Sequence, residues 1–216
     1  MKFTMGKAWF MFFARKLEKH IDFKIVKRIS KELSFTLIVA DLSLEIVSGG
    51  LLTGIKEFYY LLPGIFLIIP GLMELRGNIS SNLAQRLGTA LHLGVINWDD
   101  KFNDEAKENI KAAILSTVIN STALGIGAYI ITILIGYKAL SLVAFVFIAV
   151  TTAMLSSTIQ IFVTLYTALY THKKGYDPDN IVIPLVTSLN DITIVFILLL
   201  VLRLTIFLAT WVPILR

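Results

Sequence analysis

Residues 181–212 read IVIPLVTSLNDITIVFILLLVLRLTIFLATWV, and this run decides the class of the fold. It contains only two charged residues, Asp191 and Arg203. It is longer than the roughly 20 mostly apolar residues that a helix needs to cross the hydrocarbon core of a bilayer. Because lipid offers the backbone no hydrogen-bond partners, such a run must form an α-helix or a strand of a closed barrel. Barrel strands alternate apolar and polar residues over about ten positions. This run does not, so we predict a transmembrane helix.

The rest of the chain has the same apolar character. Its 216 residues are 56% hydrophobic and 16% charged, whereas soluble domains are about 45–50% apolar and about 25% charged. Four further apolar segments cover residues 33–55, 58–95, 110–135 and 140–170, and the second of them becomes amphipathic after Leu75. The sequence therefore predicts an all-α integral membrane protein. Its five transmembrane helices form one domain over residues 33–216, with no soluble domain appended.

Positive charge is concentrated at the N-terminus. Nine of the 20 Lys and Arg residues fall within residues 1–31, interleaved with apolar side chains such as Trp9 and Phe13. A nucleic-acid-binding arm would use the same charges. In a membrane protein, however, this pattern is typical of a helix that lies on an anionic lipid surface. We predict that residues 1–32 form an amphipathic interfacial helix that binds anionic lipids and no nucleic acid.

The charges of the connections predict the orientation. With the N-terminus in the cytoplasm, the connections at residues 97–109 and 172–180 are cytoplasmic too, and together they carry four lysines. This is the asymmetry that the positive-inside rule describes. Five spans then place the C-terminus outside, in a multi-pass protein of the cell membrane.

The residue types present exclude several kinds of chemistry. The chain has no cysteine, which excludes disulfides, zinc–thiolate sites and thiol chemistry. Zinc-protease, nucleophile-elbow, Walker and dinucleotide-binding motifs are also missing from the sequence. We therefore expect no enzymatic activity, and transport driven by ATP hydrolysis would need a separate subunit.

Asp191 is the most informative polar residue, because charge inside a membrane is costly and marks functional sites. Helical spacing places it on one stripe with Pro184, Thr187 and Ser188. Pro184 cannot donate its amide and so frees carbonyl groups nearby. Carbonyl, hydroxyl and carboxylate oxygens are the ligands that hard cations require. This pattern predicts a cation site, and the alternative is a structural aspartate bonded to a neighbouring helix.

Asp41 and Glu45 form a second acidic pair, one helical turn apart in the first span. Two like charges at low dielectric repel, so one of them holds a proton unless a cation lies between them. An ion pair with a basic residue such as Arg203 would also stabilise them. The sequence leaves the cation ligand and the ion pair equally open.

A third polar group interrupts the second span. Residues 74–86 read ELRGNISSNLAQR, with apolar sequence on both sides. Polar backbone and side chains at membrane depth are tolerated where they line a water-filled cavity or are buried in protein. We predict that Gly77 breaks the helix and that Gly77, Asn78 and Pro184 line a pore. Asn120 and the polar residues between Ser156 and Gln160 we interpret as helix-packing positions.

These stretches also resemble a known family. Residues 62–94 (LPGIFLIIPGLMELRGNISSNLAQRLGTALHLG) are similar to the signature of the solute carrier 41 family. That signature has a proline, a short apolar run, Lys or Arg, Gly-Asn, and then Leu-Ala-x-Arg-Leu-x-Thr-Ala. Residues 177–191 (DPDNIVIPLVTSLND) are similar to the last-helix motif of the MgtE magnesium transporters, in which a proline precedes an aspartate by seven residues. The resemblance covers roughly residues 33–212.

The resemblance implies a pathway for a divalent cation, with Mg2+ first among the candidates for the transported ion and Asp191 as its central ligand. We take Thr187 and Asn190, from the same motif, as further ligands beside Asp41 and Glu45. The family also implies that two such units build one pore, so we expect a homodimer in which two Asp191 carboxylates hold a hydrated ion across the axis. An exchanger coupled to Na+ or H+ and a non-transporting assembly subunit are the alternatives, and Mn2+ or Co2+ remain possible substrates.

Overall fold

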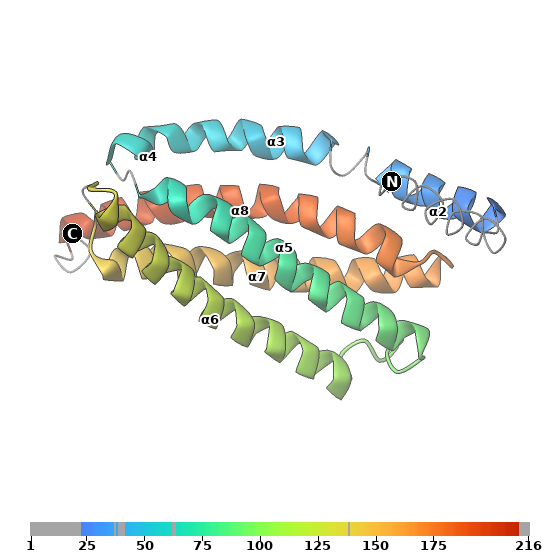
Figure 1. The fold of residues 1–216 in the computed structure, drawn as a ribbon. Helices are drawn as coiled ribbons and strands as arrows, with labels where there is room; N and C mark the ends of the chain where they lie inside the picture. The colour runs from blue at the N-terminus through green and yellow to red at the C-terminus, as the bar shows by residue number, and fades with distance from the viewer. Residues whose placement is uncertain (1–22, 37, 39–41, 62–63, 138, 212–216) are drawn as a thin grey trace, which may run out of the picture.

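The computed structural model of the chain describes residues 23–36, 38, 42–61, 64–137 and 139–211. All regular elements within these ranges are helical, which confirms the all-α class. In chain order they are α2 (Phe23–Thr36), α3 (Ser43–Leu52), the short 3-10 helix η2 (Thr53–Ile55), α4 (Lys56–Leu61), α5 (Ile65–His92), α6 (Asp104–Leu134), α7 (Leu142–Lys173) and α8 (Pro178–Trp211). Helices α5 to α8 form a bundle, and α3 lies along α8 (Figure 1).

Three of the described helices are long and apolar enough to cross a membrane. They are α6, α7 and the part of α8 between Asn180 and Leu208, and they match the last three predicted spans. Helix α5 has 28 residues, but charged and amide side chains make it less apolar. Helix α3 has ten residues, which is about 15 Å at 1.5 Å per residue and shorter than a bilayer core. The structure thus supports an all-α membrane protein without establishing the count of five.

The boundary between the first two predicted spans is wrong. We expected the first helix to end at Ile55, after a group of glycines, and the second to begin near Phe58. Instead helical turns continue through η2 and α4 to Leu61, and α5 begins at Ile65. Glycine costs a helix only about 1 kcal/mol relative to alanine, so these glycines do not end it.

The predicted helix break at Gly77 is also wrong. Helix α5 runs without interruption from Ile65 to His92. Buried residues on both sides of Gly77, among them Arg76 and Ser80, hold α5 against its neighbours. Tertiary packing of this kind outweighs the weak intrinsic preference of a single glycine.

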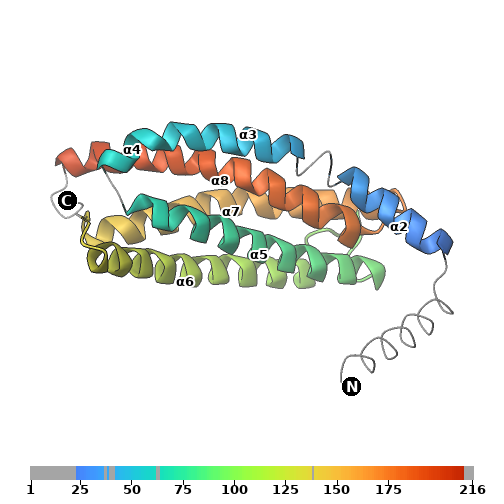
Figure 2. The same cartoon turned by 45° about the horizontal axis from the view of Figure 1, so that its top comes forward.

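Local chemistry sets the ends of the long helices. The side chains of Asn103 and Ser141 cap α6 and α7 by accepting backbone N–H groups. Helix α5 ends at His92, and Gly94, two residues further on, has a φ of 70° in the left-handed region. The amide of Val95 then donates to the carbonyl of Ala90 at 2.9 Å, as in a Schellman motif. Short connections therefore place successive long helices antiparallel (Figure 2).

The apolar core has two separate parts. One part gathers Ile68, Ile148 and Leu198 with their neighbours near one end of the bundle. The other gathers residues such as Leu87 and Leu165 near the opposite end. On each of α5, α6, α7 and α8, buried polar residues separate the positions that belong to the first part of the core from those that belong to the second. The bundle therefore has a polar layer near its middle.

Helix α2 lies beyond α3, at the end of the bundle where α5 connects to α6 and α7 to α8 (Figures 1 and 2). It packs against α8. The domain boundary predicted at residues 32 and 33 falls inside α2, and residues 1–22 lie outside the described residues.

Candidate functional site

The polar layer is the strongest candidate for a functional site within the described residues. Its buried members are Arg76 and Ser80 of α5, Thr117 and Ser121 of α6, Ser156, Ser157 and Gln160 of α7, and Ser188 and Asn190 of α8. Burying so many polar groups between apolar cores costs free energy unless hydrogen bonds compensate for the lost water. Several of these side chains have such bonds, and some do not.

Among the described residues, the hydrogen-bond partners of Arg76 are hydroxyl groups. Its side chain is 1% exposed, and its Nη1 donates to Ser157 Oγ at 2.8 Å and to Thr117 Oγ1 at 3.4 Å. The two hydroxyl oxygens are 3.0 Å apart, which closes a triangle across α5, α6 and α7. Arg76 Nε has no hydrogen-bond partner. A buried guanidinium without a carboxylate beside it is costly. The cluster of Arg76 with Thr117 and Ser157 was not predicted from the sequence.

Asp191 faces an acid from another helix. The carboxyl groups of Asp191 on α8 and Glu45 on α3 lie close enough to interact directly. The sequence analysis paired Glu45 with Asp41, which lies outside the described residues. Tertiary packing thus joins two acids that belong to opposite ends of the chain.

Arg203 is not placed to neutralise this pair. It lies about 18 Å further along α8 than Asp191, at 1.5 Å per residue. None of the ion pairs among the described residues joins Arg203 to either acid. The ion-pair alternative that the sequence left open therefore has no support from Arg203 in the structure.

The hydroxyl groups beside Asp191 are turned onto their own helix. Thr187 Oγ1 donates to the carbonyls of Ile183 at 3.0 Å and Pro184 at 2.9 Å, and Ser188 Oγ donates to Pro184 at 3.0 Å. Carbonyls next to the proline thus already have partners. The hydroxyl oxygens keep lone pairs, so Thr187 remains able to accept a bond from a hydrated ion.

Asn190 points into the bundle. Its side chain is 0% exposed, and neither its Nδ2 nor its Oδ1 has a hydrogen-bond partner among the residues that the structure describes. Helical spacing places it in one row with the buried residues Val186 and Ile194. An orphan buried amide costs about 1–3 kcal/mol, and Asn190 therefore stands out as polar without a structural reason.

A polar groove follows the contact between α5 and α6. Three adjoining cavities of about 390, 200 and 580 Å³ form it, and neighbouring cavities share Asn82 and Ser116, or Arg86 and Asn109. Asn78, one of the predicted pore-lining residues, lines the first cavity. Asn120, which we interpreted as a packing residue, lines it too. Gly77 and Pro184 line none of these three cavities.

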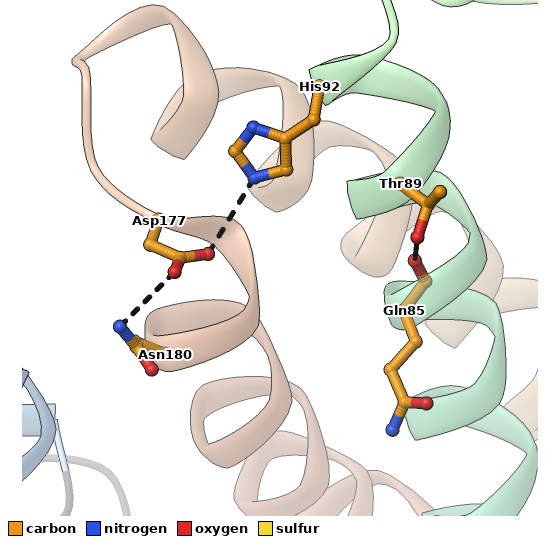
Figure 3. A network of polar contacts seen from close by, with 5 residues as sticks. All are labelled: Gln85, Thr89, His92, Asp177 and Asn180. Carbon is orange, nitrogen blue, oxygen red and sulfur yellow. Dashed lines mark hydrogen bonds and ion pairs between the residues drawn. The ribbon is translucent and has the colours of Figure 1, made fainter.

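One exposed cluster joins the ends of α5, α7 and α8. His92 Nε2 lies 3.8 Å from Asp177 Oδ1, and Asn180 Nδ2 donates to Asp177 Oδ2 at 3.4 Å (Figure 3). The rings of His92 and His172 meet edge to face, with centroids 5.5 Å apart. The cluster connects the last turn of α5 to the first turn of α8.

The described acids are few at any one place. No group of three or more His, Cys, Asp or Glu side chains in the described part of the chain is placed to hold a metal ion. Mg2+ gives up its water reluctantly and is usually bound by one or two carboxylates together with several waters. A pair of carboxyl groups such as Glu45 and Asp191 has the composition that such an ion needs.

Comparison with known proteins gives a consistent result. The profile of the MgtE family, described as a divalent cation transporter, matches residues 69–201, which is more than half of the chain. Solute carrier family 41 member 2 from Xenopus laevis is 25% identical over 166 residues, which cover 70% of this chain and 28% of the relative. The proteins of the same name from Mus musculus and Homo sapiens are also 25% identical, over 70% of this chain and 27% of their own length.

The chain spans about a quarter of the length of these curated relatives. No solved structure gives a significant match. The profile match includes all of the described polar layer and Asp191, and Glu45 precedes it.

Proposed function

Because the chain belongs to the MgtE family of divalent cation transporters, we propose that it moves a divalent cation, Mg2+ first among the candidates, across a membrane. The observation that carries the proposal is the contact between the Glu45 and Asp191 carboxyl groups in the helical bundle. Two acids in contact at membrane depth are unfavourable without a compensating cation or proton. A passing dication supplies that charge.

Selectivity in this proposal comes from charge and water. Two carboxylates lower the barrier for a dication and repel anions. Because Mg2+ keeps most of its water, the carboxylates hold it through bound waters. The Thr187 hydroxyl, on the same side of α8, adds an oxygen for one of these waters.

The proposed assembly is a homodimer. A two-fold axis along the membrane normal presents the same face of both copies to one pathway, so each acid acts twice. In this arrangement the helical segment from α3 to α4 and helix α5 serve as the first two of five spans. The basic segment that leads into α2 lies on anionic lipid at the cytoplasmic surface.

One observation favours proton-coupled exchange as a second candidate. Two acids in contact at low dielectric are relieved either by a cation or by a proton on one of them, and Glu45 and Asp191 are such a pair. Arrival of a dication would release that proton. Intramembrane acids that bind and release protons are typical of relays in transporters.

Flux into proteoliposomes tests the proposal. The full chain is reconstituted, and Mg2+ entry is followed with an internal fluorescent indicator under an inward Mg2+ gradient. Asp191→Asn keeps the shape of the side chain and removes its charge, so we expect it to abolish most of the flux. Asp177→Asn, an exposed acid at the start of the same helix, is the matched control and should retain it.

Four outcomes of the flux assay separate the alternatives. Flux that follows an imposed pH gradient supports exchange, and flux that ignores it supports a channel. Near wild-type flux in Asp191→Asn would refute the role of this acid. If the wild-type chain moves no divalent cation at all, the transport proposal is refuted and the assembly-subunit alternative is favoured. Native mass measurement on the same preparation shows whether the protein is a dimer.

A further inference from the structure

We propose that Glu74 is the carboxylate of a second cation-binding site, which lies in the groove between α5 and α6 and takes a hydrated divalent cation. The inference rests on the proposed function, since it assumes that the bundle crosses a membrane and handles such ions. It adds a site on a different face from the Glu45–Asp191 pair, which lies between α3 and α8.

Several oxygen-bearing side chains meet in a cavity beside Glu74. The cavity of about 390 Å³ between α5 and α6 has five polar lining residues, Glu74, Asn78, Asn82, Ser116 and Asn120, beside Gly71, Leu75 and Ile79. The polar side chains supply one carboxylate, three amide carbonyls and one hydroxyl. Hard cations such as Mg2+, Mn2+ and Ca2+ bind oxygen ligands of these kinds. The volume leaves room for the ion and several of its waters, at about 30 Å³ for each water.

The asparagine side chains of this cavity use their amide nitrogens in hydrogen bonds to their own helices. Asn78 Nδ2 donates to Glu74 Oε1 at 2.9 Å, and Asn82 Nδ2 donates to the backbone carbonyl of Asn78 at 2.9 Å. On the opposite helix, Asn120 Nδ2 donates to the carbonyl of Ser116 at 2.8 Å. Each acceptor is a pure acceptor, so the amide nitrogens must face them. The amide oxygens are therefore left for a ligand.

Glu74 and Asp191 can be compared by their depth along the bundle axis. In the parallel pair α5 and α7, Arg76 contacts Ser157, so Glu74 is level with Leu155. In the antiparallel pair α7 and α8, Gln160 contacts Val186, so Leu155 is level with Asp191. The Arg76 and Gln160 side chains that make these contacts are long, so the depths of Glu74 and Asp191 along the bundle axis agree to within one helical turn, or ~5.4 Å. Glu74 and Asp191 thus lie at a similar depth in the bundle.

Glu74 also lacks a basic partner among the described residues. Glu74 is exposed in the single chain, and no ion pair to it occurs within the stretches that the structure describes. Arg76 is two residues away and therefore about 200° around the helix axis, on the buried side. An acid at membrane depth is expensive and faces water, protein or an ion instead of lipid. An oxygen-lined cavity at the same place satisfies that requirement.

A binding experiment with Mn2+ tests the site directly. Mn2+ is a hard dication whose aqueous electron paramagnetic resonance signal is lost on binding. The full chain in lipid nanodiscs is titrated as wild type, as Glu74→Gln, and as Glu108→Gln. The last variant removes an exposed acid of α6 outside the groove. We expect Glu74→Gln to weaken one class of site by about tenfold, the order expected for one unit charge acting on a dication through water.

The control and a second variant complete the test. Glu108→Gln should titrate as wild type does. Asn120→Leu, on the opposite wall of the cavity, should weaken the same class of site as Glu74→Gln. Asp191→Asn should instead weaken a different class. The proposed second site would be overturned if Glu74→Gln bound Mn2+ as Glu108→Gln does. It would also be overturned if Asp191→Asn alone removed both classes of Mn2+ site.

Failure of this inference can be told apart from failure of the proposed function. If wild-type proteoliposomes move Mg2+ and Glu74→Gln still binds Mn2+ as wild type does, only the second site is wrong. If no flux occurs and the Glu74-dependent site is present, the site exists in a protein that does not transport.

Discussion

Gly125 of α6 lies directly against the backbone of α7, and alanine there should destabilise the bundle. A Cβ atom added to Gly125 would lie 2.8 Å from Val146 Cα and 3.1 Å from both Phe145 O and Val146 N. Ordinary contacts of this kind begin at about 3.4 Å, so the two helices must separate by roughly 0.6 Å along a shared interface. Backbone atoms cannot rotate away as a side chain can. Close packing over small residues is the main source of helix association in membranes.

The expected magnitude comes from two opposing effects. Overpacking of a well-packed interface costs about 1–3 kcal/mol, while glycine to alanine within a helix contributes up to about 1 kcal/mol in favour of folding. Gly127 is two residues further along the same helix, and a Cβ atom there would meet nothing within 4 Å. Gly127→Ala thus carries the second effect without the first. We expect Gly125→Ala to be less stable than Gly127→Ala by about 1–3 kcal/mol.

Equilibrium unfolding measures this difference. Each variant is purified in mild detergent and titrated with sodium dodecyl sulfate while circular dichroism follows the loss of helix. Gly127→Ala should unfold at the same or a higher fraction of dodecyl sulfate than wild type, and Gly125→Ala at a lower fraction. Equal midpoints for the two variants, or the reverse order, would show that α6 and α7 do not approach as described.

Three further variants test the polar layer. Ser157→Ala removes the 2.8 Å partner of the Arg76 guanidinium and should cost about 1.5–3 kcal/mol of stability. Ser156→Ala removes only a bond to the carbonyl of its own helix and should cost less in the same unfolding titration. Asn190→Leu replaces an amide that lacks partners by an apolar side chain of similar branching, and should raise stability by about 1–3 kcal/mol. Slower Mg2+ flux in Asn190→Leu would show that the Asn190 amide has a role in transport. A loss of stability would instead contradict the finding that this amide lacks hydrogen-bond partners.

Features that depend on neighbours in sequence could be predicted from the sequence. Apolar runs set the existence and length of α6, α7 and α8, because the backbone in lipid has few alternatives to a helix. The same reasoning identified Asp191, since one carboxylate in a long apolar run is conspicuous without any structure. Predictions of helix ends at glycines failed. At Gly77 the packing of the flanking residues decided the outcome, not the preference of one residue.

Features that depend on the rotation and lateral order of the helices required the tertiary structure. Helical periodicity indicates which residues share a face of one helix, but it does not say which other helix covers that face. The sequence could therefore pair Glu45 only with Asp41, its neighbour one turn away, while packing of α3 along α8 brings Glu45 to Asp191. Arg76 likewise has its hydroxyl partners on α6 and α7. Glu74 meets an oxygen-lined cavity only because α6 lies beside α5.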